Sequence, residues 1–265
     1  MKGKDLSFSY LNKFKVYYSF KQGKKTYIFL HGIGGCKNHF VKAFDYIKNK
    51  NVGVLTIDLP GFGKSKLPKK FKIKSVISLH VEILNRLIKK LKIEKTILVV
   101  FSLATCYLPA IKNQKFWSKI EKVVVLEGSF VDADLTWSKK IYSLNKNTYD
   151  QYISDFKLKR KRIMKLLTFR DLNEKENNFF SNCFKNMDNS ILKKLIFESV
   201  NMVKNKKLMN FLIKSKKKFI LIYSKKLFLM RKNQYLKKRK VFLISKCNHY
   251  LMIDNENNTY KKVFL

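Results

Sequence analysis

Short apolar segments rich in Val, Ile and Leu recur along the 265-residue chain and restrict the folds that it can adopt. They fall at residues 26–31, 52–58, 96–101, 122–127, 218–223 and 240–245. Continuous apolar runs of this kind are typical of strands buried on both faces. Segments with helical spacing, such as 75–91, separate the first four runs. The sequence therefore predicts an α/β fold with a mostly parallel central sheet flanked by helices.

Residues 134–217 interrupt this alternation, because they hold helical patterns and no convincing strand. Helices are expected at 135–144, 149–167 and 191–213. We therefore predict a core formed by residues 1–133 and 218–265, with 134–217 as a helical lid over the loop edge of the sheet.

The charge is strongly positive: 58 Lys and Arg against 18 Asp and Glu give a formal net charge of +40. Such a field attracts nucleic acid, anionic membranes or acidic proteins. The lysines are spread along the whole chain, and no RNA-binding signature or zinc-finger spacing appears, so we expect a solvated basic surface and no specific nucleic-acid partner. One segment, "FKLKRKRIMKLL" at 156–167, is locally both basic and apolar.

The cysteines, Cys36, Cys106, Cys183 and Cys247, form no CxxC pair and no repeated spacing. They suggest neither a disulfide framework nor a zinc site, and we expect no metal and no cofactor. The N-terminus has no apolar signal region, and the most apolar window, 96–111, is shorter than the roughly 18 to 20 residues that a bilayer requires. A cytoplasmic protein without a membrane span is predicted.

Four segments carry the chemistry: "HGIGG" at 31–35, "DLPGFGKS" at 58–65, "VVFSLAT" at 99–105 and "CNHYLMIDN" at 247–255. Right-handed crossovers place the loops after parallel strands at one edge of the sheet. Glycines in the first segment allow positive φ, so that backbone N–H groups can point at an anion. In this order and spacing the segments resemble the α/β-hydrolase superfamily, in its serine esterase-like branch with a lid, from about Tyr27 to the C-terminus.

The resemblance implies a serine hydrolase that cleaves a small carboxylic ester or thioester through an acyl-enzyme. Ser102 is then the nucleophile, His249 the general base, and the backbone N–H groups of Ile33 and Leu103 form the oxyanion hole. A serine hydroxyl needs a histidine to take its proton, and the tetrahedral oxyanion needs donors aimed at its developing charge. The chain also resembles pimeloyl-acyl-carrier-protein methyl ester esterases, which makes an acidic acyl carrier protein a candidate partner.

The segment around Ser102 departs from the G-x-S-x-G pattern, because Val100 and Ala104 replace both glycines. This departure keeps open an alternative, a catalytically degenerate protein that uses the same fold for binding. Of the remaining histidines, His31 is expected to be structural, and His39 and His80 to be solvated or packed on helices.

The third member of a triad is expected at an unusual place. The family most often supplies its acid after the strand that corresponds here to 218–223, but no Asp or Glu lies between Glu198 and Asp254. Glu127 follows the preceding strand, where some hydrolases place their acid, and it can orient the histidine from there. Asp132 and Asp134 are weaker candidates, whereas Asp254 is expected to belong to the following helix.

Overall fold

The central sheet has eight strands in the order β1-β2-β4-β3-β5-β6-β7-β8. The computed structural model describes residues 4–47, 51–230, 236 and 239–265. Strands β3 to β8 run parallel, whereas β2 is antiparallel to both β1 and β4. The strands are β1 (Lys4–Tyr10), β2 (Phe14–Lys21), β3 (Lys25–Leu30), β4 (Val52–Ile57), β5 (Lys95–Phe101), β6 (Ile120–Leu126), β7 (Lys218–Ser224) and β8 (Lys240–Ile244). The predicted fold class and its six apolar strands are confirmed.

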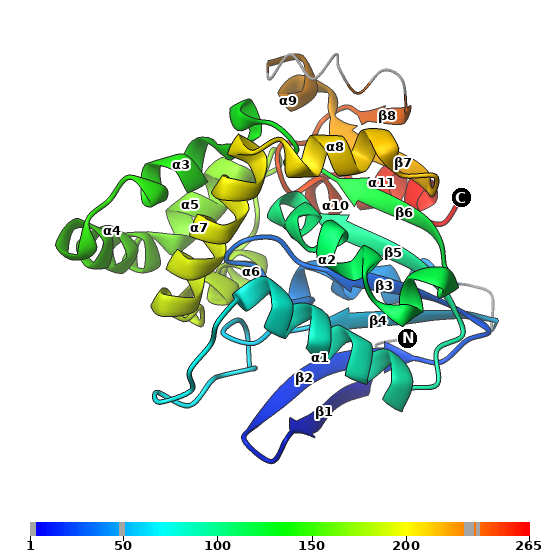
Figure 1. Ribbon diagram of the computed structural model, residues 1–265. Helices are drawn as coiled ribbons and strands as arrows, with labels where there is room; N and C mark the ends of the chain where they lie inside the picture. Colours follow the sequence, from blue (N-terminus) through cyan, green and yellow to red (C-terminus); the bar gives the residue numbers. More distant parts are fainter. Residues whose placement is uncertain (1–3, 48–50, 231–235, 237–238) are drawn as a thin grey trace.

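Helices cover both faces of this sheet (Figure 1). The α-helices are α1 (Val76–Lys90), α2 (Leu108–Lys112), α3 (Thr136–Tyr142), α4 (Lys146–Leu158), α5 (Arg160–Leu167), α6 (Glu174–Lys185), α7 (Asn189–Lys204), α8 (Lys207–Lys214), α9 (Lys225–Met230), α10 (Leu251–Asp254) and α11 (Glu256–Val263). Short 3₁₀ helices are η1 (Lys37–Phe44), η2 (Ser102–Tyr107), η3 (Lys115–Lys119) and η4 (Asp132–Leu135).

The core consists of two apolar layers, one on each face of the sheet. In β3, Ile28 and Leu30 pack in the layer beneath α1, α2, α7 and α8, whereas Tyr27 and Phe29 pack in the layer beneath η1, α10 and α11. This alternation follows from the two-residue period of a strand. Because both faces are covered, the central strands carry apolar residues at nearly every position, as the sequence pattern indicated.

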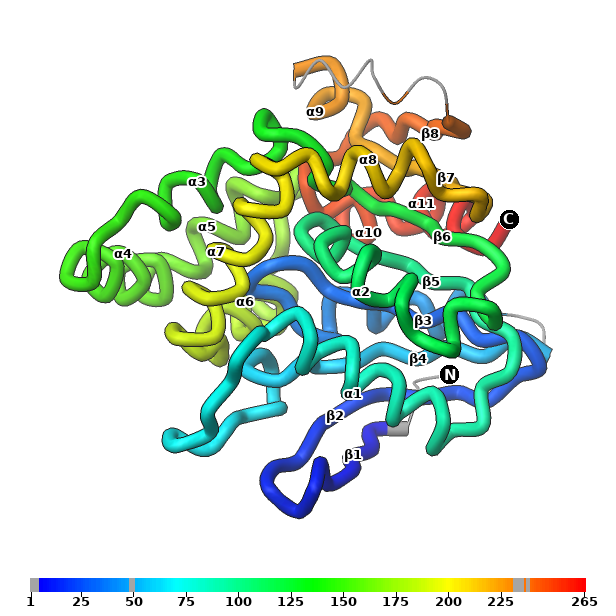
Figure 2. The backbone as a smooth tube through the Cα atoms, in the orientation of Figure 1, coloured from blue at the N-terminus to red at the C-terminus, as the bar shows by residue number. Residues whose placement is uncertain are grey.

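The segment between β6 and β7 is helical, as predicted, and α3 to α7 form a lobe at one end of the sheet (Figure 2). Its details differ from the prediction. The helix expected at 149–167 is divided at Lys159 into α4 and α5, and the one expected at 191–213 is divided where Lys206 adopts a φ of +55°. Helix α6 was not anticipated. It begins with a capping box between Asn173 and Glu176.

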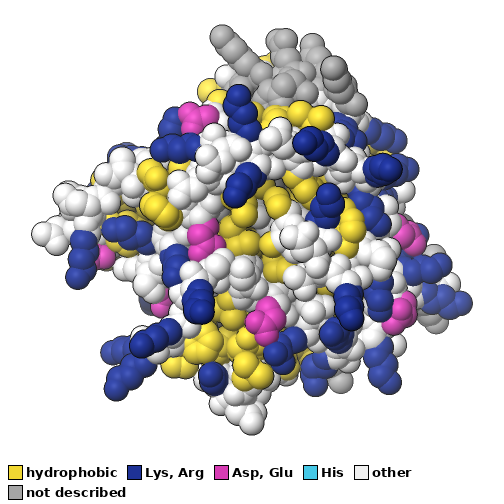
Figure 3. Space-filling model, in the orientation of Figure 1, with side chains coloured by type: hydrophobic (Ala, Val, Ile, Leu, Met, Phe, Trp, Pro, Cys, Tyr) yellow, Lys and Arg dark blue, Asp and Glu magenta, His cyan; other side chains and the backbone are white. Residues whose placement is uncertain are grey.

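The surface carries lysine and arginine side chains over the whole visible face rather than in one patch (Figure 3). This distribution agrees with the even spread of cations along the sequence. Among the described residues, no helix has both the length and the apolar character needed to cross a membrane.

Candidate active site

Ser102 lies at the sharp turn that ends β5 and begins η2. Its φ of +54° is in the left-handed region, which costs a non-glycine residue about 1–3 kcal/mol and occurs preferentially at functional sites. The turn forms although Val100 and Ala104 replace the expected glycines. Both are fully packed, and Val100 lies in register with Leu30 and Val125 of the neighbouring strands.

His249 approaches Ser102 from the loop between β8 and α10. Its Nε2 lies 3.1 Å from the Oγ of Ser102, which is hydrogen-bond distance. The ring of Phe101 packs against the imidazole with the centroids 4.9 Å apart, and Tyr250 contacts it edge-on at 5.6 Å. Two residues 147 positions apart in the chain therefore meet at the carboxyl edge of the sheet.

Glu127 lies directly after β6, fully buried and with a φ of +48°. Its Oε1 accepts a hydrogen bond of 2.5 Å from the backbone N–H of Ser224, which ends β7. Its Oε2 lies 3.8 Å from Nδ1 of His249, which is too long for a hydrogen bond but within ion-pair range. Catalytic hydrogen bonds are often long before substrate binds. The structure thus places a carboxylate behind the imidazole, on the side away from Ser102.

The other acids near the site are engaged elsewhere. Asp132 forms an exposed ion pair with Lys139. One carboxylate oxygen of Asp134 accepts the backbone N–H groups of Phe130 and Val131. None of these contacts involves the imidazole of His249.

Asp254 is in α10, as expected, but its carboxylate also accepts hydrogen bonds that hold the loop carrying His249, between β8 and α10. Its Oδ2 accepts the N–H of Asn248 at 2.8 Å, and its Oδ1 accepts the N–H groups of Phe169 at 2.8 Å and Arg170 at 3.3 Å. The carboxylate therefore joins the residue before His249 to the segment that follows α5. The local sequence pattern does not signal this role, because Phe169 and Arg170 lie 85 and 84 positions away in the chain.

The glycine turn after β3 packs directly against the serine turn. A Cβ on Gly32 would lie 2.8 Å from Cβ of Ser102 and 2.9 Å from the carbonyl oxygen of Phe101, so only glycine fits there. Gly34 adopts a φ of +66°. Ile33 and Leu103, whose N–H groups are the predicted oxyanion donors, line the same cavity as Ser102.

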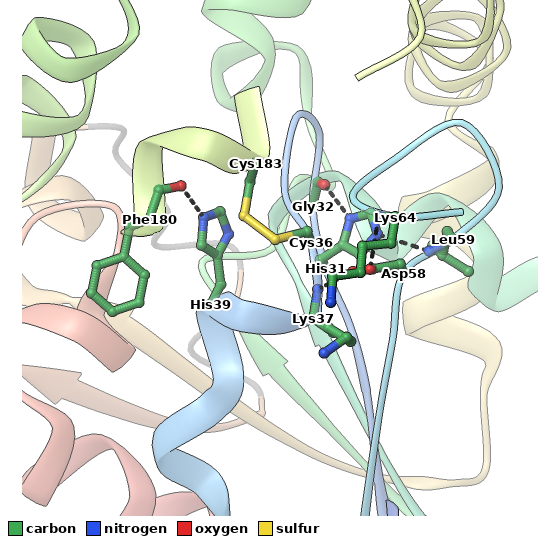
Figure 4. Close-up of a disulfide and its surroundings, with 10 residues drawn as sticks. All are labelled: His31, Gly32, Cys36, Lys37, His39, Asp58, Leu59, Lys64, Phe180 and Cys183. Carbon is green, nitrogen blue, oxygen red and sulfur yellow. Dashed lines mark hydrogen bonds between the residues drawn. A yellow bond between two sulfur atoms is a disulfide. The ribbon is translucent and has the colours of Figure 1, made fainter. Parts of the chain in front are cut away.

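Buried polar side chains hold this glycine turn in place (Figure 4). His31 donates from Nδ1 to the carbonyl oxygen of Gly32 at 2.8 Å and accepts at Nε2 from the N–H of Leu59 at 3.1 Å. Burial lowers the pKa of His31 to about 4, so its ring is neutral near pH 7. Asp58 accepts the N–H groups of Lys37 and Lys64, which connects the loops after β3 and β4.

His39 and His80 are packed inside the molecule. His39 lies against Tyr250 with ring centroids 4.8 Å apart, and its Nε2 is 3.3 Å from the carbonyl oxygen of Phe180. His80 bonds to the hydroxyl of Tyr107 and the carbonyl oxygen of Pro60. Burial lowers the pKa of each to about 3. None of these hydrogen bonds reaches Ser102. The contact of His39 joins η1 to α6, and the contacts of His80 join α1 to η2 and to the loop after β4.

The sequence suggested no disulfide, and this prediction is wrong for one pair of cysteines. Cys36, at the end of the glycine turn, and Cys183 in α6 form a disulfide across 147 residues (Figure 4). The spacing of the cysteines in the sequence does not predict this disulfide, because the two sulfurs meet only when α6 packs on the loop after β3. Cys106 and Cys247 are free and buried.

A cavity of about 400 Å³ opens above Ser102 and His249. Ser102, Asn248 and His249 at the carboxyl edge of the sheet supply part of its polar lining, and Asp134, Thr136 and Ser138 of η4 and α3 supply another part. Its apolar walls come largely from the helical segment between β6 and β7. The apolar lining includes Ile33, Leu103, Trp137, Phe156, Ile163, Leu166, Leu167, Phe184, Leu227 and Met230. A nucleophile and base beside an apolar cavity can transfer an acyl group whose chain occupies that cavity.

Comparison with known proteins agrees with this architecture. The family described as "alpha/beta hydrolase fold" matches residues 26–256. Similar solved structures include an esterase from Exiguobacterium antarcticum (16% identity, TM-score 0.73, 98% of each chain covered) and the Cif epoxide hydrolase from Acinetobacter nosocomialis (17%, 0.75, 98% of this chain and 88% of that one). A bromoperoxidase from Bacillus anthracis is similar as well (15%, 0.73, 98% of each). A search of curated protein sequences finds no match. The chain belongs to the α/β-hydrolase superfamily.

Proposed function

We propose that this hydrolase is a serine esterase that cleaves a carboxylic ester or thioester through an acyl-enzyme. The observation that carries the proposal is the 3.1 Å contact between Ser102 Oγ and His249 Nε2 beneath an apolar cavity. For Nε2 to accept the serine proton, the neutral ring must carry its own proton on Nδ1. That nitrogen faces the carboxylate of Glu127, which would hold this tautomer and stabilise the imidazolium.

The reaction then has two halves. Ser102 Oγ attacks the carbonyl carbon as its proton passes to His249 Nε2, and the N–H groups of Ile33 and Leu103 receive the negative oxygen. Collapse of the tetrahedral intermediate expels the alcohol or thiol, which takes the proton from Nε2. In the second half, water gives a proton to the same nitrogen as it attacks the acyl carbonyl carbon. The bond between that carbon and Ser102 Oγ then breaks, the carboxylic acid leaves, and Nε2 returns the proton to Oγ.

Three helices of the segment between β6 and β7 support its role as a lid. Trp137, Phe156 and Leu166, from α3, α4 and α5, all line the cavity above Ser102. We assign to these walls the choice of acyl chain, because this segment supplies most of the apolar lining. We therefore propose a core of residues 1–133 and 218–265 with a lid at 134–217.

The test is hydrolysis of p-nitrophenyl esters from acetate to dodecanoate. Wild type is expected to turn over, and Ser102→Ala to be inactive. Ser129→Ala is the matched control, because Ser129 lines the same cavity and is expected to keep activity. Val100→Gly, which restores a family glycine beneath the serine turn, is expected to be at least as active as wild type. A fully inert wild type and Val100→Gly would support the alternative, a hydrolase fold used only for binding.

The acyl-carrier-protein ester and the cytoplasmic location stay predictions. An acidic carrier would be attracted by the net charge of +40, and its binding would weaken as salt screens that charge. Failure to associate with a carrier protein at low ionic strength would exclude this substrate while leaving the esterase proposal intact.

A further inference from the structure

The basic and apolar segment at 156–167 lies beside the mouth of the catalytic cavity. It forms the end of α4 and the whole of α5, where Ile163, Leu166 and Leu167 line the cavity. Residues 156–170 hold seven Lys and Arg and no acid. On α5 the buried side is occupied by Met164, while Arg162 and Lys165 are exposed. The helix therefore presents cations outward and apolar side chains toward the cavity.

Large apolar side chains at the same mouth are exposed to solvent. Leu166 of α5 and Met230 of α9 both line the cavity, yet they are 71% and 68% exposed. Leu158, Phe169 and Leu229 are exposed as well, and each lies within two residues of a side chain that lines the cavity. Leu166 and Met230 are therefore exposed apolar side chains at the mouth itself, and the other three lie on the segments that form it.

Most of the surrounding cations have no acidic partner. Lys161 pairs with Glu174 at 3.7 Å and Arg170 with Glu176 at 2.8 Å. In the part of the chain that the structure describes, no acid within 4.0 Å forms an ion pair with the exposed cations Lys159, Arg162, Lys165, Lys225 and Lys226. Exposed apolar side chains beside unneutralised cations match an anionic surface with an apolar interior.

We propose that the rim of the cavity, formed by residues 158–169 of α4 and α5 and residues 225–230 of α9, docks onto the surface of an anionic lipid bilayer. A second copy of this chain is disfavoured there, because two molecules of net charge +40 repel each other. An acidic protein would satisfy the cations but gives no reason for the exposed apolar side chains Leu166 and Met230 at the mouth. A lipid surface accepts both, with phosphates on the cations and Leu166 and Met230 among the upper acyl chains.

This docking goes beyond the proposed function and does not depend on it, so it is tested on the 265-residue chain with Ser102→Ala. Co-sedimentation is measured with vesicles of phosphatidylcholine alone and with vesicles containing roughly one third phosphatidylserine. We expect binding to the second and little to the first. Arg162→Gln with Lys165→Gln should weaken binding about 30-fold, at about fivefold per cation. Leu166→Ser with Met230→Ser should weaken it by about tenfold.

Matched variants separate this surface from the general charge of the protein. Lys89→Gln with Lys90→Gln removes two exposed cations from α1, and Phe197→Ser with Ile213→Ser removes two exposed apolar side chains from α7 and α8. Both should bind nearly as wild type. Equal losses in the rim and control variants would overturn the proposal, as would equal binding to both vesicles. Binding to an acidic acyl carrier protein through Arg162 and Lys165 without vesicle binding would also overturn it.

Discussion

The disulfide between Cys36 and Cys183 should contribute a large part of the stability of the folded chain. A cross-link stabilises mainly by restricting the unfolded state, and the effect grows with the length of the loop that it closes. For residues 147 positions apart, the chain-entropy relation gives about 5 kcal/mol at 25 °C as an upper value. Measured contributions are commonly about 2–4 kcal/mol, so we expect a result within this range.

The assay compares urea unfolding of the oxidised and the reduced wild type, which differ only in the cross-link. With an m-value of about 3 kcal/mol per molar urea, a loss of about 2–4 kcal/mol should lower the midpoint by about 0.7 to 1.3 M on reduction. Cys36→Ala with Cys183→Ala should unfold near the reduced midpoint and should not respond to reductant. Thiol titration of the unfolded, unreduced wild type should find the thiols of Cys106 and Cys247 alone. Titration of all four thiols, or identical midpoints, would refute the reasoning.

Three further predictions concern the site and its supports. Glu127→Gln keeps an oxygen acceptor for the N–H of Ser224 and should keep the fold, but ester turnover should fall by about 10²- to 10⁴-fold. The control Asp132→Asn should remain near wild type, and the reverse result would transfer the role to Asp132. Gly32→Ala places a Cβ 2.8 Å from Ser102 Cβ, so kcat/KM should fall about 100-fold while the circular dichroism spectrum stays native. Unchanged kinetics would show that the glycine turn after β3 and the serine turn after β5 are not in close contact. Acid should destabilise the protein through its buried histidines. The pKa of His31 is about 4 in the folded state and 6.5 in the unfolded state. Its contribution of about 3 kcal/mol to the free energy of unfolding is therefore present above pH 6.5 and is lost as the pH falls to 4. A urea midpoint that stays constant over that interval would contradict this assignment.

The central strands and the order of the site loops were predictable because they depend on local pattern. Strands β3 to β8 are short apolar runs, and parallel strands place the loops after β3, β5, β6 and β8 at one edge. The assignment of Ser102 and His249 to one site also needed the resemblance to the α/β-hydrolase superfamily, which identifies the serine and histidine loops. No acid lies between Glu198 and Asp254, so the acid was expected on the loop after β6. On that loop the resemblance favoured Glu127 over Asp132 and Asp134.

What escaped prediction depends on long-range contacts or on weak local signals. The hairpin of β1 and β2 was not predicted, because its strands alternate apolar with mostly polar residues and so differ from the continuous apolar runs of the central strands. Its turn also uses Leu11 and Asn12 at positive φ rather than glycine. The division between α4 and α5 at Lys159 breaks a segment whose helical pattern is continuous. The hydrogen bonds of Asp254 and the Cys36–Cys183 disulfide join segments far apart in the chain, which no local pattern reports.

The central claim is that Ser102 is a nucleophile activated by His249 despite the loss of both family glycines. The most direct measurement is labelling with a fluorophosphonate, followed by mass spectrometry to find the modified residue. We predict a single adduct on Ser102 that forms in wild type and in Ser129→Ala and is absent from Ser102→Ala and His249→Ala. Failure of wild type to react, or an adduct that persists in Ser102→Ala, would contradict the account.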